Sequence, residues 1–326
     1  MNFGDTAQIK GCTIKARFLE SSSGNSSIDN LLGGALPSSC ITILDETRSR
    51  VYADTLTKYF LSEGLYNDHD LLVVDPCSSV ADFYKGLPTK LEVQEATKEP
   101  TAEGDNMKIA WRYESAPRVN SAIGTKNRYD LGKTLENFSL SRSQRLSYSE
   151  ENGPSYLGLL KHLKELLNSD SYTKSKSANK KNLLRVVIRN LGFPLWSDSQ
   201  NLSVFLAHLQ YLTRNSYCLV MATMCSSSLP KDLVTELEVT ADCFFRLVAM
   251  TDEEKKVLPS LDKAHGYFYI VKLPRLTSIA THCPSAVDLI FELHRRSFDI
   301  KILHLPPALS GPEPSNTKTA CSTIDF

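Results

Sequence analysis

The sequence has no excess of either charge: 37 lysines plus arginines balance 37 aspartates plus glutamates over 326 residues. A free-standing nucleic-acid-binding domain usually carries a basic excess. Any contact with nucleic acid must therefore come from a local patch or from partner chains. Apolar residues make up 41% of the chain and charged residues 23%, which is ordinary for a globular protein with a core of useful size.

Long hydrophobic runs are also missing. No stretch approaches the roughly 18 apolar residues that a membrane-spanning helix needs. The first twenty residues mix charged and apolar side chains and contain no signal-peptide core. We therefore predict a soluble protein of the cytoplasm and nucleus, with no membrane partner.

The eight cysteines include no C-x-x-C pair. A structural zinc site needs ligand pairs of that kind, and several of the cysteines fall in apolar runs such as 217–220. We predict reduced, buried thiols in an intracellular protein, and no metal site.

Strand and helix patterns alternate along the chain. Apolar and β-branched runs predict strands at 40–44, 71–74, 107–113, 183–188, 217–223, 243–250 and 266–273. Apolar spacings of three and four predict helices at 52–63, 82–87, 154–167, 202–213, 230–238 and 287–295. The helix at 154–167 is expected to bury Leu157, Leu160, Leu163 and Leu167. The fold class is therefore α/β, a mostly parallel sheet flanked by helices, with antiparallel edge strands.

Composition divides the chain into one domain and three irregular segments. We predict a flexible N-terminal arm at 1–20, a single domain at 21–305, and a disordered tail rich in Ser, Pro and Thr at 306–326. A stretch of Ser, Asn and charged residues at about 114–150 is predicted to be a mobile insertion.

The segment after the first buried strand has neither glycine nor lysine. The order helix, Gly-Gly, Leu-Pro, buried strand, loop, helix leads into the phosphate loop of nucleotide-hydrolysing enzymes, G-x-x-x-x-G-K-[ST]. Its glycines expose backbone N–H groups to the phosphates, and its lysine meets the β- and γ-phosphates. This chain has instead Asp45, Glu46, Thr47, Arg48, Ser49 and Arg50. Its two carboxylates would repel a triphosphate, so we predict a degenerate nucleotide loop, no tight ATP binding and no cofactor.

Two other positions bear on nucleotide chemistry. Gly132-Lys133-Thr134 resembles the end of a phosphate loop, but Asn127 stands where the first glycine belongs, so we predict a surface turn. Asp75 follows a buried strand, where it is either a water-activating carboxylate or a turn residue before Pro76. Without a lysine or a magnesium ligand it cannot transfer a phosphoryl group, so we interpret it as the turn residue.

The catalytic motifs G-x-S-x-G and H-E-x-x-H are absent from the sequence. We therefore predict no catalytic residues in this chain.

Several segments together resemble one family. Residues 24–37, 107–113, 129–131, 187–196 and 266–307 are similar to the fourth-subunit family of the Elongator complex. The resemblance covers nearly the whole chain. Its tryptophan-containing segments are the most specific, whereas Gly-Gly-Leu-Pro is shared by many RecA-like proteins.

The resemblance implies a RecA-like fold and a place in an assembly. In that family, subunits 4, 5 and 6 form a heterohexameric ring, which binds tRNA and joins the larger catalytic subcomplex of subunits 1 to 3. The complex supports carboxymethyl-type modification of the wobble uridine U34 of tRNA, with indirect links to transcription elongation and translation. The family lacks a regular phosphate loop, and this sequence keeps that departure, so we predict a non-catalytic subunit.

A basic cluster just before a core strand is the first candidate for tRNA contact: Lys174, Lys176, Lys180 and Lys181. It is either a set of phosphate contacts or a solvated loop. The loop at 226–231 is a candidate for the ring pore, and Arg112, Arg118 and Arg128 are further unranked candidates.

Two other hypotheses stay open. The chain is an active ATPase with an atypical site that uses Asp75 and Arg48 or Arg50, or it is a scaffolding or regulatory protein with no role in nucleic-acid binding.

Overall fold

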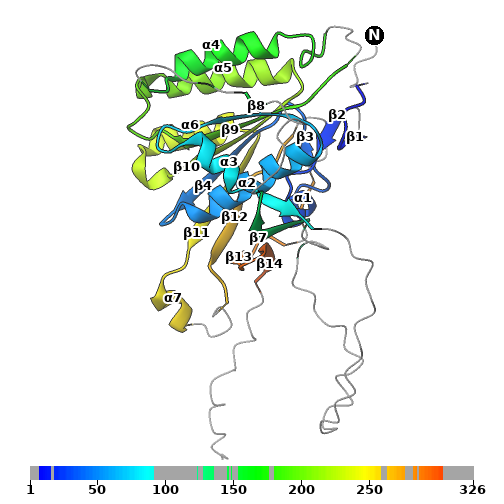
Figure 1. The fold of residues 1–326 in the computed structure, drawn as a ribbon. Helices are drawn as coiled ribbons and strands as arrows, with labels where there is room; N and C mark the ends of the chain where they lie inside the picture. The colour runs from blue at the N-terminus through cyan, green and yellow to red at the C-terminus, as the bar shows by residue number, and fades with distance from the viewer. Residues whose placement is uncertain are drawn as a thin grey trace, which may run out of the picture.

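In the computed structural model, the strands of the described residues assemble into one large and two small β-sheets (Figure 1). The structure describes residues 7–15, 18–91, 123, 128–135, 145–146, 148, 153–175, 180–257, 263–275, 282–284 and 286–303. The large sheet contains β4 (Ile41–Thr47), β5 (Asp70–Val74), β8 (Arg145–Leu146), β9 (Leu184–Leu191), β10 (Cys218–Met224), β11 (Cys243–Ala249), β12 (Gly266–Lys272), β13 (Leu289–Leu293) and β14 (Phe298–Ile302). The small sheets contain β1 (Cys12–Lys15), β2 (Phe18–Ser21) and β3 (Leu36–Pro37), and β6 (Pro88–Lys90) and β7 (Tyr129–Thr134).

Helices connect these strands. They are α1 (Ser26–Leu31), α2 (Val51–Tyr66), α3 (Val80–Lys85), α4 (Tyr156–Leu167), α5 (Leu202–Arg214), α6 (Lys231–Thr240) and α7 (Asp252–Val257), with short 3-10 turns η2 (Ser199–Asn201) and η3 (Ser226–Ser228). Among the described residues, no helix has the length and apolar character needed to cross a membrane.

The large sheet is mostly parallel. Its strand order is β14-β13-β12-β11-β4-β10-β9-β5-β8. The strands from β11 to β8 run parallel, whereas β12, β13 and β14 pair antiparallel at one edge. The predicted fold class is confirmed. The loop-bearing strand β4 lies inside the parallel part, so its carboxyl end opens between β11 and β10.

Two apolar layers cover the sheet. Side chains alternate across each strand: Val187 on β9 faces the layer that contains α2, whereas Val186 and Ile188 face the layer that contains α4, α5 and α6. Figure 1 shows α4 and α5 on the opposite side of the sheet from α2. Parallel strands buried on both faces read as continuous apolar runs, which is why their positions were predictable.

The buried face of α4 differs from the prediction. The helix buries Tyr156, Leu159, Leu163 and Leu167, while Leu157 is 49% exposed. The ring of Tyr156 stacks on that of Trp196 at a centroid distance of 4.2 Å. This stacking fixes the rotation of the helix, so the predicted face was right only at its carboxyl-terminal end.

The predicted helix at 287–295 is wrong, because this segment is strand β13. Its residues Leu289, Ile290 and Phe291 are all buried between the neighbours β12 and β14. A short apolar run of this length fits a buried strand as well as a helix, and pairing on both sides decides for the strand.

The predicted flexible arm at 1–20 is wrong for strands β1 and β2, which pair antiparallel and bury Leu19. A fully buried arginine on β9 anchors them. Arg185 donates from Nη2 to Ser21 Oγ at 2.6 Å and to the Ser22 carbonyl at 3.0 Å. It also donates from Nε to Nδ1 of the buried His69 at 3.0 Å. Burial, and then the Arg185 charge, lower the pKa of His69 to about 3.

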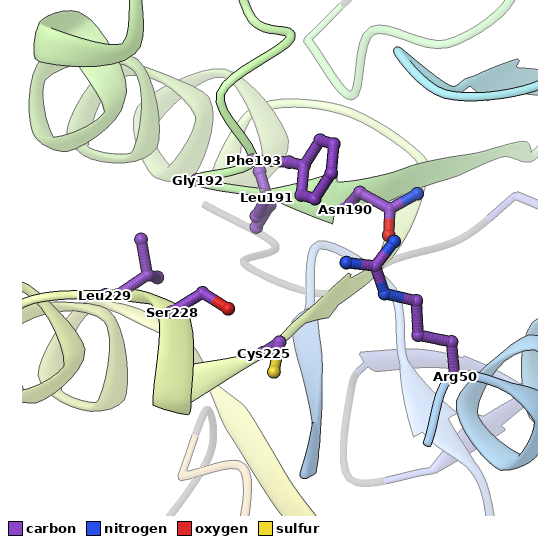
Figure 2. A pocket seen from close by; sticks show the side chains of 8 residues that line it. All are labelled: Arg50, Asn190, Leu191, Gly192, Phe193, Cys225, Ser228 and Leu229. Atoms are coloured by element: carbon purple, nitrogen blue, oxygen red, sulfur yellow. The ribbon is translucent and has the colours of Figure 1, made fainter. Parts of the chain in front are cut away.

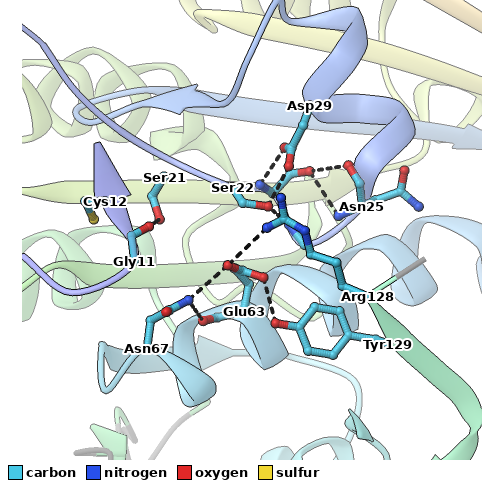
Figure 3. Close-up of polar contacts among 12 residues, drawn as sticks. Gly11, Cys12, Ser21, Ser22, Asn25, Asp29, Glu63, Asn67, Arg128 and Tyr129 are labelled. Atoms are coloured by element: carbon cyan, nitrogen blue, oxygen red, sulfur yellow. Dashed lines mark hydrogen bonds and ion pairs between the residues drawn. The ribbon is translucent and has the colours of Figure 1, made fainter. Parts of the chain in front are cut away.

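Part of the predicted insertion at 114–150 is also ordered. Tyr129, at the start of β7, is 1% exposed and donates its hydroxyl to Glu63 Oε2 at 2.6 Å (Figure 3). The mobile-insertion prediction is therefore wrong for β7. The predicted strand at 107–113 and the tail at 306–326 lie outside the described residues.

Candidate functional site

The predicted degenerate loop is shorter than the sequence indicated. Strand β4 continues through Asp45, Glu46 and Thr47, so only Arg48, Ser49 and Arg50 link it to α2. The continuation occurs because these residues pair in register with β11. Arg48 then turns the chain with a φ of 70°, a left-handed conformation that is uncommon outside glycine.

Asp45 does not face an open site. It is fully buried, and its Oδ1 accepts the Ser226 N–H at 2.8 Å. Its Oδ2 accepts from Arg246 Nε at 2.7 Å, and Arg246 also binds Glu238 at 2.5 Å. The Asp45 charge is therefore already paired. The sequence analysis predicted that Asp45 would repel a triphosphate. Because its charge is paired, Asp45 does not exclude a nucleotide in that way.

Glu46 occupies the position that a phosphate takes in a phosphate loop. Its Oε2 accepts the Ala53 N–H at 2.6 Å, and its Oε1 accepts the Tyr52 N–H at 3.3 Å. Backbone N–H groups at the start of a helix bind anions because they have no partner within the helix. Here the protein's own carboxylate uses them. Burial raises the pKa of Glu46, while these N–H groups pull in the opposite direction.

The remaining loop side chains attach to neighbouring elements. Arg48 Nη1 donates to the Ala249 carbonyl at 2.9 Å and pairs with Glu254 at 3.3 Å. Ser49 Oγ accepts the Val51 N–H at 3.3 Å, so this N–H of the first turn of α2 is also satisfied. The loop is thus held against β11 and α7 by its own bonds.

The cavity beside the loop is small. Figure 2 shows Arg50 on one side and Asn190, Phe193 and Leu229 around it. The Arg50 guanidinium lies over the Phe193 ring, 4.7 Å from its centroid. The volume is about 10 Å³, which is room for about one water molecule and far too little for a nucleotide.

Asp75 is tied into a buried ion-pair network. Its side chain is fully buried and paired with Arg189, which also binds Asp54 through Nε at 3.1 Å. Asp75 Oδ1 accepts the Cys77 N–H at 2.9 Å and the Asn190 amide at 3.1 Å. With these partners the carboxylate has no free face for activating a water, and its bond to Cys77 is that of a turn residue.

The Gly132-Lys133-Thr134 segment is part of β7 and is exposed. The predicted surface turn is therefore wrong in its local structure, because Leu131 bonds across to the β13–β14 turn and β7 pairs with β6. The segment lies on another sheet from the loop after β4.

The predicted lysine cluster lies at the amino end of β9, opposite the edge that carries the loop after β4. Lys181 Nζ donates to the carbonyls of Asp170 at 2.8 Å and Thr173 at 2.6 Å. Lys174 Nζ lies 5.6 Å from the Tyr217 ring centroid, and Lys180 is exposed. Lys176 lies outside the described residues. Lys181 thus helps to hold its own loop.

Sequence reasoning missed two arginines that organise this edge of the sheet, Arg189 and Arg246. Arg189 directly follows the buried run Val186 to Ile188, at the carboxyl end of β9. Acids at the ends of β4 and β5 face the same edge. A search for basic residues at neighbouring strand ends would have placed Arg189 at this edge of the sheet, but it would not have shown which acid Arg189 binds. Within the described part of the chain, no group of three or more His, Cys, Asp or Glu is placed to hold a metal ion.

The fold places the chain among α/β proteins with a mostly parallel sheet, and its own Glu46 binds the N–H groups at the start of the helix that follows the first buried strand of that sheet. The chain belongs to the PAXNEB protein family, whose family model matches residues 8–324. The recognised resemblance to the fourth subunit of Elongator is confirmed by relatives that bear the name Elongator complex protein 4.

The relatives cover most of the chain. The Danio rerio protein is 31% identical over 325 residues, covering 89% of this chain and 82% of its own. The Mus musculus protein is 30% identical, covering 89% and 77%. The Homo sapiens protein is 29% identical, covering 91% and 79%. A solved KaiC-like protein, PH0186 from Pyrococcus horikoshii OT3, has a TM-score of 0.46 at 12% identity, covering 87% of this chain and 99% of that one.

Proposed function

We propose that this chain is a non-catalytic subunit of the Elongator complex. In this proposal it forms a heterohexameric accessory ring with subunits 5 and 6, joins the catalytic subcomplex of subunits 1 to 3, and helps to bind tRNA for U34 modification in the cytoplasm and nucleus. The shared name of its relatives supports membership of Elongator. Links to transcription elongation and translation are indirect.

The observation that carries the non-catalytic part is the use of the α2 N-terminus by Glu46. Phosphoryl transfer needs N–H groups and a lysine on the phosphates, a magnesium ligand and a positioned water. In this chain the N–H groups of Tyr52 and Ala53 bind Glu46. Asp75, the candidate for the water, is paired with Arg189. No ATP cofactor is therefore proposed.

Titration calorimetry of the full chain with Mg²⁺-ATP tests the absence of a nucleotide site. We expect no binding at micromolar nucleotide. Micromolar affinity that is lost on Asp75→Asn would support the alternative, an ATPase with an atypical site that uses Arg48 or Arg50. Lys85→Ala is the control, because the Lys85 side chain on α3 is exposed and pairs only with the exposed Asp82 among the described residues.

Native mass spectrometry tests the assembly. Mixed with subunits 5 and 6, the full chain should appear in a six-subunit complex. A chain that stays monomeric in the mixture would contradict the ring.

The tRNA part separates the proposal from a purely scaffolding or regulatory protein. The complete ring should bind tRNA with an affinity that falls as salt rises, because phosphate contacts release counterions. Neutralising Lys174, Lys176, Lys180 and Lys181 to Gln tests the predicted cluster. Full, salt-sensitive tRNA affinity in that variant would remove these lysines from the binding surface and leave the ring function intact.

A further inference from the structure

Exposed basic residues gather where three distant segments meet. It consists of Lys90 on β6, Arg128 and Lys133 on and just before β7, and Arg295 and Arg296 in the turn between β13 and β14. We call these five residues the basic turn patch. Figure 1 shows β7 beside β13 and β14.

Backbone bonds hold the three segments together. The Leu131 N–H donates to the Arg296 carbonyl at 3.1 Å. The Leu91 N–H donates to the Arg128 carbonyl at 2.8 Å, and Lys90 pairs in register with Tyr129. The patch is therefore built on paired strands and a short turn, so binding a ligand costs little ordering of the backbone.

All five basic side chains belong to exposed residues. The Arg296 side chain is 77% exposed and that of Arg128 is 49% exposed. Within the described part of the chain, Lys133 and Arg295 have no carboxylate partner within 4.0 Å. These two charges are available to a ligand.

The neighbouring carboxylates lie beneath the patch and have other partners. Glu63 accepts from the Tyr129 hydroxyl at 2.6 Å and the Asn67 amide at 2.9 Å (Figure 3). Its contact with Arg128 is longer, at 3.5 Å. Asp130 accepts the Gly132 N–H at 2.8 Å and lies 3.9 Å from Arg296.

Two further acids lie next to the turn, the buried Glu292 and Asp299, whose side chain is 28% exposed and accepts from Ser297 Oγ at 2.7 Å. Glu292 has two partners. It binds Lys301 at 2.7 Å and His294 at 2.9 Å. Among the described residues, the exposed charges at this place are therefore mainly positive, on a chain whose net charge is zero.

The composition of the patch favours a phosphate backbone over a protein surface. Protein interfaces have an apolar centre, but Leu91 is the one large apolar side chain beside the patch that is exposed among the described residues. A phosphate backbone requires fixed positive charges and no apolar centre. The guanidinium fork of arginine also matches two phosphate oxygens at once.

We propose that the basic turn patch binds the phosphate backbone of RNA. This inference rests on the proposed function, under which the RNA is tRNA, and it locates the contact on a surface other than the lysine cluster. Arg295 and Arg296 make direct phosphate contacts from the turn, and Lys133 extends the contact along β7.

The test is tRNA binding by the complete ring, measured by fluorescence anisotropy of labelled tRNA across a series of salt concentrations. The variant Lys133→Gln, Arg295→Gln, Arg296→Gln should bind about tenfold or more weakly at 0.1 M salt. The slope of log affinity against log salt should fall by about 2, because each phosphate contact contributes about 0.7 to 0.9.

Two further variants control for net charge and for folding. Lys161→Gln, Lys164→Gln, Lys231→Gln removes the same charge from exposed positions on α4 and α6, and should bind like the wild type. Arg295→Lys with Arg296→Lys keeps the charge and should retain most of the affinity. All variants should share the wild-type thermal midpoint and assemble into the ring.

Three results overturn the inference. In the first, the patch variant binds tRNA with wild-type affinity and salt slope. In the second, the control variant on α4 and α6 weakens tRNA binding as much as the patch variant does. In the third, the patch variant loses binding of polyglutamate but keeps that of tRNA, which assigns the patch to an acidic protein. A wild-type ring with no salt-sensitive tRNA affinity is a separate outcome, since it overturns the proposed function and this inference together.

Discussion

The loop after β4 and the basic turn patch both concentrate charge, but they use it in opposite ways. Asp45 and Glu46, on β4 just before the loop, are buried and bonded to an arginine or to backbone N–H groups. In the patch the acids are buried, and Arg295 and Arg296 remain exposed. Charge that is buried and paired stabilises the fold, whereas exposed charge without a close partner is free to bind another molecule.

The largest effect is expected from a substitution that removes one partner of a buried ion pair. Arg189→Ala leaves Asp75, fully buried, without its cation, and also frees Asp54. Losing one partner of a buried ion pair costs about 3–5 kcal/mol. We expect a loss of that size in the free energy of unfolding, measured by chemical denaturation of the full chain.

Lys85→Ala is the matched control for Arg189→Ala. Its ion pair with Asp82 is highly exposed, at 77% and 70% for the two side chains. Solvent and salt screen exposed pairs of this kind, so Lys85→Ala should lose far less stability than Arg189→Ala. If both variants lose the same stability, the contrast between buried and exposed charge does not hold in this protein.

Lowering the pH tests the contribution of a second buried group, the imidazole of His69, to stability. The pKa of His69 is about 3 in the folded chain, below its usual 6.5. The unfolded chain therefore takes up this proton first, and stability is lost as pH falls from about 6.5 toward 3. The loss from this group should reach about 1.4 kcal/mol per pH unit.

His69→Gln should flatten this part of the dependence of unfolding free energy on pH. Gln accepts from Arg185 and does not titrate, so the wild type and the variant should converge as the pH falls. Parallel curves for the two proteins between pH 6.5 and 4 would show that His69 is not the source of the acid sensitivity.

Glu46 should have a smaller effect, because it acts as a helix cap. Glu46→Ala frees the N–H groups of Tyr52 and Ala53, and the loss of a cap costs about 0.5–2 kcal/mol. Burial raises the pKa of Glu46, so its stabilising contribution is largest at low pH and falls as pH rises through that pKa.

Glu46→Gln sharpens the same point. Gln stays neutral at every pH. The free energy of unfolding of the Glu46→Gln variant should therefore improve relative to that of the wild type as pH rises from about 4 to 7. Urea denaturation at several pH values measures this, and a relative stability that worsens with rising pH would contradict the burial effect.

The smallest effect on stability is expected in the basic turn patch. Arg295→Gln with Arg296→Gln should change the free energy of unfolding by about 0.5 kcal/mol or less, as for other exposed surface positions. A loss above about 1.5 kcal/mol would show that the arginines support the turn itself, which would erase the difference between the two regions.

Local patterns predicted the elements whose burial is uniform. The run Leu71 to Val74 and the spacing in Leu202 to Thr213 identified β5 and α5 within one residue of their ends. The prediction of secondary structure was wrong where pairing with other strands decides between helix and strand. The segment Leu289 to Leu293 has the composition of a helix or a strand, and only its pairing with β12 and β14 selects the strand.

The candidate site shows the same division. The absence of glycine and lysine between Leu44 and Ala53 is visible in the sequence, and it excludes an ordinary phosphate loop. The partners were not visible: Arg189 is 114 residues from Asp75, and Arg246 is 201 residues from Asp45. Sequence separation of that size carries no information on which charges meet.

Composition and local order alone determined that this chain is an α/β protein with a nucleotide loop that lacks its usual residues. Only the tertiary structure decided that Glu46 fills the end of α2, and that the strand carrying Lys133 lies beside the turn carrying Arg295 and Arg296. The physical reason is that short-range periodicity sets which segments become strands and helices. The packing of distant strands sets which side chains are neutralised and which stay exposed.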